Sequence, residues 1–198
     1  MARVPATERR RQLVDAAFRV IGRDGFAAAT TRRVCAEAGA PLAAFHYCFA
    51  SKQELLVELT EQAMRELEEA RAGGAVLRGT VAESLRATLR GYWDTVQADP
   101  NRESVLVALT QHALGDAGLA GVAQRQYEAY HRTAADTLRE IAAGCGVRWA
   151  LPVEAVARML VVVTDGVTVA WLVDRDGAAA TAVLDAFADQ LAGLAEPA

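Results

Sequence analysis

Hydrophobic residues recur along most of the chain at intervals of three and four positions, the spacing of one face of an α-helix. Leu13, Ala17 and Val20 share such a face near the amino terminus, as do Leu85 and Leu89 further along. No segment alternates hydrophobic and polar residues over the length of a strand, so the pattern predicts an all-α protein without strands. We expect about nine helices, near residues 7–23, 30–38, 41–47, from 51 onward, 80–98, 101–114, 118–143, 152–174 and 178–194.

The expected helix ends carry residues suited to capping. Thr30 supplies a hydroxyl for an N-cap, and Gly39 stands where a left-handed backbone ends a helix. Pro41 can begin the next helix. The segments 51–54 and 80–83 each read as a capping box, in which a Ser or Thr is followed three positions later by Glu.

The two short helices and the glycine turn within residues 30–47 have the length of a helix-turn-helix, whose second helix enters the DNA major groove. These residues and those that flank them resemble the amino-terminal signature of the TetR/AcrR family of transcriptional regulators. In that signature, a helix that begins with Thr and a Gly turn are followed by an aromatic residue, a Phe, a Lys and a Leu at fixed spacing. The matching positions are Gly25, Thr30, Thr31, Val34, Gly39, 45–49 and 51–56.

The resemblance implies an amino-terminal three-helix DNA-binding domain over residues 1–51. Residues 52–198 would then form a larger helical domain that binds an effector and dimerises. It also implies a homodimer that binds a double-stranded DNA operator. Apart from the resemblance, we expect a cytoplasmic protein with no cofactor, metal or catalytic activity. The expected function is that of a repressor released from a pseudo-palindromic operator by a small, mostly apolar effector.

The expected DNA contacts divide into phosphate and base contacts. Helix N-termini present free N–H groups, so Thr30, Thr31 and the nearby Lys52 suit phosphate oxygens. By the resemblance, Arg32 is the residue that reaches a guanine edge, and Arg33 contacts phosphate. The second helix offers Leu42, Ala43 and Ala44 for thymine methyl groups, with Phe45 in the core, His46 as a backbone contact where the family usually has Tyr, and Tyr47 for base reading.

Charge is distributed unevenly along the chain. The whole chain has a net charge of −4, but residues 1–55 carry nine Lys or Arg and five Asp or Glu. The basic amino-terminal part can therefore approach a polyanion. No apolar signal-peptide core follows the first arginines. The longest apolar run, 159–173, has Asp165 near its middle and is too short for a membrane span, so we expect a soluble protein.

The carboxy-terminal half predicts a dimer interface and a ligand cavity. Residues 156–173 are apolar on nearly all sides, and the final helix carries an apolar stripe, so two copies would form a four-helix interface. An effector cavity between helices needs a few polar groups among apolar ones. The candidates are Trp93, Gln111, His112, Tyr127, Tyr130, Asp165 and Trp171.

Other classes of function have weaker support. The GxSxG, HExxH, P-loop and GxGxxG motifs are absent from the sequence, which argues against an enzyme. Cys35, Cys48 and Cys145 fit no metal or disulfide spacing, and we treat them as small buried residues. A helical small-molecule-binding or redox-sensing protein that never touches DNA remains the alternative.

Overall fold

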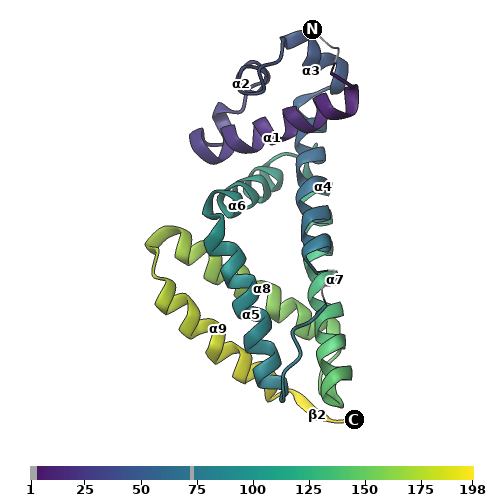
Figure 1. The fold of residues 1–198 in the computed structure, drawn as a ribbon, viewed down its shortest axis with the longest axis vertical. Coiled ribbons are helices and arrows are strands. Elements are labelled where there is room, and N and C mark those ends of the chain that lie inside the picture. The colour runs from purple at the N-terminus through teal and green to yellow at the C-terminus, as the bar shows by residue number, and fades with distance from the viewer. Residues whose placement is uncertain (1–3, 72–73) are drawn as a thin grey trace. The chain divides into compact units, whose positions relative to one another are not determined.

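The computed structural model describes residues 4–71 and 74–198. Within these ranges the chain forms nine α-helices, one 3-10 turn and two short strands (Figure 1). The elements are α1 (Ala6–Asp24), η1 (Phe26–Ala28), α2 (Thr31–Glu37), α3 (Leu42–Cys48), α4 (Lys52–Arg71), α5 (Val81–Ala98), α6 (Pro100–Gly115), α7 (Ala120–Cys145), β1 (Val147–Trp149), α8 (Val153–Asp174), α9 (Gly177–Ala192) and β2 (Ala195–Pro197).

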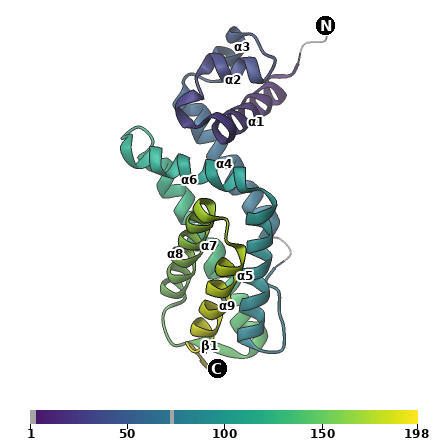
Figure 2. The same ribbon diagram turned by 90° about the vertical axis from the view of Figure 1, so that its left-hand side faces the viewer.

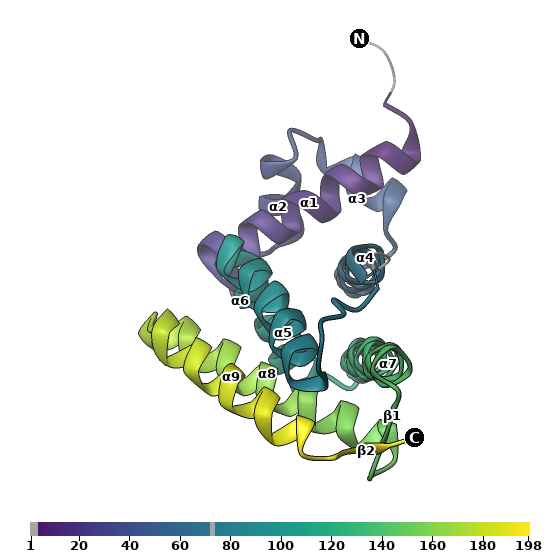
Figure 3. The ribbon, with the colours of Figure 1, turned by 60° about the horizontal axis from the view of Figure 1, so that its bottom comes forward.

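The predicted all-α class and the nine expected helices are confirmed, but the prediction of no strand is wrong. Strands β1 and β2 pair antiparallel (Figure 3). Arg148 lies opposite Glu196 in this pairing, and their side chains form an ion pair. Each strand has only three residues, which is too short for an alternating pattern to be visible in the sequence. Gly146, at φ +65°, makes the turn from α7 into β1.

The chain folds as two compact units. The first unit contains the residues up to Glu66 together with Asn101–Gln126, and the second contains Leu67–Pro100 and Tyr127–Ala198. Helices α4 and α7 contribute to both units. The unit that contains the two short helices thus also includes the first part of α4 and nearly all of α6. The functional boundary expected between residues 51 and 52 remains a prediction.

The core of the first unit forms where α1 packs on α2 and α3 (Figure 1). Leu13 and Val20 of α1 are fully buried, as the helical pattern predicts, and Phe45 and Phe49 close the core from the other side. Helix α6 also approaches α1 closely, since a Cβ added at Gly22 would lie 3.3 Å from the Val105 side chain. The short helices are therefore held by burial against a longer one, because two-turn helices are marginal alone.

In the second unit, α9 lies beside both α5 and α8 (Figure 2). Leu85, Leu89 and Trp93 of α5 are buried in a continuous apolar core that includes residues of α7, α8 and α9. The capping box at the start of α5 is confirmed: Glu83 N–H donates to the Thr80 hydroxyl at 3.2 Å, and Thr80 N–H donates to the Glu83 carboxylate at 2.9 Å.

Helix α8 corrects one sequence argument. The sequence predicts an apolar run too short for a membrane span, but the run belongs to a 22-residue helix, the one helix of the described chain that is long and apolar enough to cross a membrane. Core helices of soluble proteins meet the same criterion. Several apolar side chains of α8 are exposed in the single chain, namely Met159, Val162, Val169 and Val173.

Candidate functional site

The first short helix begins as the sequence predicts. Thr30 is its N-cap, and the Thr30 hydroxyl accepts a hydrogen bond of 3.2 Å from the backbone N–H of Arg33. Thr31 is the first helical residue and is half-buried, while Thr30 is exposed. This end of α2 is therefore ordered and accessible, the arrangement that lets backbone N–H groups bind an anion.

A tight turn joins α2 to α3. Gly39 has φ +59°, a left-handed conformation that glycine adopts without strain, which confirms its expected role. The N–H of Ala40 donates to the Cys35 carbonyl at 2.9 Å and closes the turn. Pro41 precedes α3 as its N-cap residue rather than lying inside the helix, and its fixed φ directs the chain into Leu42.

Helix α3 has one buried and one exposed face. Phe45 and Cys48 point into the core, with the Phe45 side chain 1% exposed, as predicted. The outer face is open: Tyr47 is 69% exposed and Leu42 is 40% exposed. Of the other expected contacts, Ala43 and His46 are exposed and Ala44 is half-buried. The exposed face thus offers apolar groups, a phenol and an imidazole.

The two neighbouring arginines of α2 have different surroundings. The Arg33 guanidinium donates to the Asp24 carboxylate at 2.8 Å. Arg23 bonds to the same carboxylate, and the two arginines hold the pKa of Asp24 below its ordinary value, with Arg23 the larger cause. Arg32 is exposed and makes no hydrogen bond or ion pair within the part of the chain that the structure describes. Arg32 is therefore free to reach a ligand, whereas Arg33 must first leave Asp24.

Lys52 begins α4, and its Nζ lies 4.8 Å from the centre of the Phe26 ring. Burial lowers the pKa of Lys52. The cap of this helix differs in one half from a capping box: Glu54 N–H donates to the Ser51 hydroxyl at 3.1 Å, but the Glu54 carboxylate accepts from Ala50 N–H at 2.7 Å instead of from Ser51.

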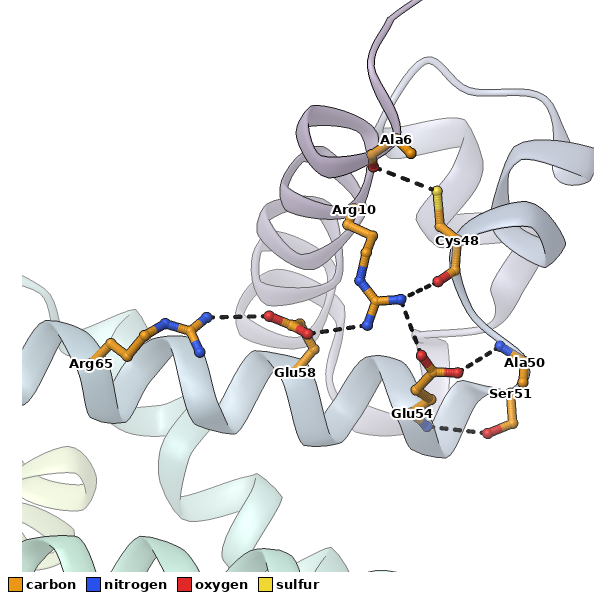
Figure 4. A network of polar contacts seen from close by, with 8 residues as sticks. All are labelled: Ala6, Arg10, Cys48, Ala50, Ser51, Glu54, Glu58 and Arg65. Atoms are coloured by element: carbon orange, nitrogen blue, oxygen red, sulfur yellow. Dashed lines mark hydrogen bonds and ion pairs between the residues drawn. The ribbon is translucent and has the colours of Figure 1, made fainter.

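Arg10 organises this region, and the sequence reasoning missed it. Its guanidinium donates to the Cys48 carbonyl, to Glu54 at 3.0 Å and to Glu58 at 3.1 Å (Figure 4). It also lies over the Phe49 ring, 4.2 Å from its centre. Although burial alone would lower the pKa of Arg10, the hydrogen bonds to Glu58 and Glu54 raise it. Arg10 thus ties α1 to the end of α3 and the start of α4.

The second unit gathers several of the expected ligand residues near Asp165. The Tyr127 hydroxyl donates to Asp165 Oδ2 at 2.6 Å, and the Tyr127 and Tyr130 rings meet edge to face at 5.7 Å. Burial raises the pKa of Asp165, and burial together with the Asp165 hydrogen bond raises the pKa of Tyr127 to about 12. His131, which was not expected here, lies with its ring 6.1 Å from Tyr127.

Trp93 and Trp171, also expected as ligand residues, form a neighbouring aromatic pair. Their rings meet edge to face with 5.2 Å between centres. Among the described residues, Trp93 Nε1 is buried without a hydrogen-bond partner, although buried indole N–H groups usually have one. Thr168, one turn from both Asp165 and Trp171 on α8, bonds to the Tyr92 hydroxyl at 2.6 Å. The α8 face between Asp165 and Trp171 is therefore lined by aromatic and polar groups.

The remaining two expected ligand residues lie elsewhere. Gln111 and His112 are exposed on α6, in the first unit. The His112 ring stacks on Phe26 with 3.9 Å between ring centres and 30° between planes. Helical periodicity could not separate these two residues from the others, because it gives no information on which unit α6 joins.

Comparison with known proteins gives matches over most of the chain. The family model described as bacterial regulatory proteins, tetR family, matches residues 13–59, and the one described as BetI-type transcriptional repressor, C-terminal, matches residues 81–195. A curated relative, the HTH-type nicotine-responsive transcriptional repressor HdnoR of Paenarthrobacter nicotinovorans, is 30% identical over 177 residues, which are 87% of this chain and 88% of that protein.

Two solved structures extend the comparison to three dimensions. The multidrug binding protein EbrR, complexed with imidazole, is 28% identical, with 89% of this chain and 93% of that chain covered and a TM-score of 0.65. A transcriptional regulator from Saccharomonospora viridis in complex with choline is 20% identical, with 96% and 99% covered and a TM-score of 0.77. At that identity the second likeness shows the shared fold.

Proposed function

The chain belongs to the TetR family of bacterial regulatory proteins, and from this premise we propose that it is a homodimeric repressor released from its operator by a small effector. It is a ligand-responsive, DNA-binding transcriptional regulator. The observation that carries the proposal is the exposed face of α3 together with the exposed Arg32, which makes no ion pair among the described residues. Both lie within residues 13–59, the segment that matches the model of bacterial regulatory proteins, tetR family.

For the DNA contact, α3 enters the major groove with Tyr47, Leu42 and Ala43 toward the bases. Arg32 reaches a guanine edge, where a bidentate contact contributes about 1 to 3 kcal/mol of discrimination. The backbone contacts come from Thr30, Thr31, Arg33, His46 and Lys52, while Ala44 joins Leu42 and Ala43 as a contact to thymine methyl groups. Because α3 carries few hydrogen-bonding groups, much of the sequence preference rests on Arg32, Tyr47 and the shape of the DNA.

For dimerisation, the exposed apolar groups of α8 and α9 pack against those of a second copy. Val162 is 64% exposed and Val173 is 83% exposed on α8, and Val183 is 49% exposed on α9. Apolar surface of this kind on a soluble chain marks an interaction site. A two-fold dimer places its two recognition helices ~34 Å apart, about one turn of DNA, and so requires a pseudo-palindromic operator.

For the effector, the site is the cluster formed by Tyr127, Tyr130, Asp165, Trp93 and Trp171 in the second unit. The ligand is mostly apolar, since rings dominate the cluster, and it carries one donor or positive charge for Asp165. HdnoR is described as nicotine-responsive, and the Saccharomonospora viridis regulator was solved with choline, so nicotine and choline are the first compounds to test. Gln111 and His112 are left out of this site.

Release follows from unequal binding of two conformers. The ligand-free dimer occupies the operator, and the effector favours a conformer whose paired recognition helices no longer fit adjacent major grooves. The protein acts in the cytoplasm by binding and release, without catalysis, and α8 serves as a buried interface helix instead of a membrane span.

Selection of bound sequences from random DNA with the purified protein tests the proposal. We expect enrichment of two inverted half-sites with centres about 10 base pairs apart. The selected duplex then serves to screen small molecules, beginning with nicotine and choline, for release of the protein. Enrichment of a single undivided site, or of no sequence at all, would contradict the proposal.

A further inference from the structure

The Phe26 ring contacts two side chains that come from distant parts of the chain. It lies in η1, directly after the left-handed Gly25, between the two helices α1 and α2. The His112 ring of α6 stacks on Phe26 at 3.9 Å, and the Lys52 ammonium group of α4 lies 4.8 Å from the same ring centre. Three elements of the first unit therefore meet at a single half-buried aromatic ring.

Lys52 differs from most neighbouring cations in what it contacts. The Arg10 and Arg33 guanidinium groups are held by carboxylates. Lys52 forms no ion pair in the part of the chain that the structure describes, and an aromatic face is its contact instead. A cation over a ring keeps its charge available to an anion, while the ring restricts a side chain that would otherwise sample many rotamers.

We propose that Phe26 is a positioning residue that presents the Lys52 ammonium group to an operator phosphate, with His112 of α6 holding the ring in place. This inference rests on the proposed function, because it requires the first unit to bind DNA. Burial lowers the pKa of Lys52, as expected for an ammonium group partly removed from water before it meets its anion.

The stack also connects this DNA contact to α6. His112 stands 86 positions after Phe26, on a helix that approaches α1 at Gly22 and whose Arg102 donates to the Ala63 carbonyl of α4 at 3.3 Å. A shift of α6 within the first unit therefore moves the support of the ring that orients Lys52. The position of α6 is in this way coupled to the strength of one phosphate contact.

The test is the salt dependence of binding to the selected operator, because the slope of log affinity against log salt reports how many phosphates the protein neutralises. The slope falls in magnitude by about 0.9 for each phosphate that is no longer neutralised, so by about 1.8 for a dimer in which each half releases one. We expect this reduction for Lys52→Gln and for Phe26→Leu. Phe26→Tyr keeps the aromatic face and is expected to keep the slope, and the double variant Phe26→Leu/Lys52→Gln is expected to match Lys52→Gln alone.

Other results would overturn the inference without touching the proposed function. If wild type binds the operator but Lys52→Gln leaves the slope unchanged, Lys52 meets no phosphate. If Phe26→Leu tightens binding, the ring withholds Lys52 from DNA. If Phe26→Leu and Lys52→Gln have additive effects, Phe26 acts on the fold of the unit, which melting temperatures of the same variants report independently. Failure of wild type to bind any selected DNA would instead refute the proposed function.

Discussion

The Arg33 guanidinium donates to the Asp24 carboxylate at 2.8 Å, across the turn between α1 and α2. Asp24 also binds Arg23, so one carboxylate at the end of α1 pairs with two arginines. Adjacent Arg32 has no such partner within the described chain. The two arginines are adjacent in the sequence but differ in role. Arg33 stabilises the fold through its ion pair with Asp24, whereas Arg32 is available to bind a ligand.

Replacing Arg32 by Ala is expected to relax specificity at one position of each half-site. The loss is about 1 to 3 kcal/mol of discrimination against the wrong base, because the bidentate guanine contact disappears. Arg33→Ala is the matched control and is expected to weaken binding by a similar factor for every sequence. Competition between the operator and single-base variants measures both. Equal loss of discrimination in the two variants would contradict the assignment.

Arg10→Met is expected to destabilise the protein by about 1 to 3 kcal/mol. The change leaves Glu54, Glu58 and the Cys48 carbonyl without their shared donor in a partly buried setting. Arg11→Met is the control, since Arg11 makes only exposed pairs with Glu8 and Asp15, which contribute little. Urea denaturation followed by circular dichroism gives both values. Similar free energies of unfolding for the two variants would show that the Arg10 network is not a structural tie.

Features that depend on residues close together in the sequence, such as helix caps, could be predicted. Contacts between residues far apart in the sequence could not. Thr30, Gly39 and the Thr80–Glu83 box cap helices through neighbours within a few positions, so the sequence predicts them. Arg10 acts on residues 38 to 48 positions away, and nothing in a helical period indicates which arginine will do so.

The same limit explains the other differences. Strands β1 and β2 pair across a whole helix hairpin, and three residues carry no readable alternation. His112 is an expected ligand residue because the sequence shows a polar side chain on a helix but not the unit to which that helix belongs, and its partner Phe26 lies in another part of the sequence. The expected ligand residues on α5, α7 and α8 lie in one unit because their helices share one apolar core.

Asp165→Asn is expected to change the pH dependence of stability. The pKa of Asp165 is raised above its ordinary value of 3.8 because the carboxyl is buried, so its contribution to stability is present below pH about 4 and is lost as the pH rises through the raised pKa. Asn cannot ionise and keeps its contribution. Melting temperatures between pH 4 and 7 should therefore favour the variant increasingly as pH rises. If the melting temperature of wild type rose relative to that of the variant over this range, the raised pKa of the buried Asp165 would be contradicted.

Val162→Arg is expected to convert the dimer into monomers. It places a charge on the exposed apolar face of α8, where Val162 is 64% exposed in the single chain. Leu114→Arg is the control, because Leu114 is 72% exposed on α6, outside the proposed interface. Light scattering after size-exclusion chromatography gives the masses. A dimeric Val162→Arg protein would show that this part of α8 is not the interface.

The central claim is that this chain binds DNA through α2, α3 and the start of α4. One binding measurement tests it most directly. Fluorescence anisotropy of the selected operator is recorded with wild type and with Arg32→Ala/Lys52→Ala, after circular dichroism confirms that the variant is folded. We expect specific binding by wild type and its loss in the double variant. Undiminished operator binding by the folded double variant would contradict the account.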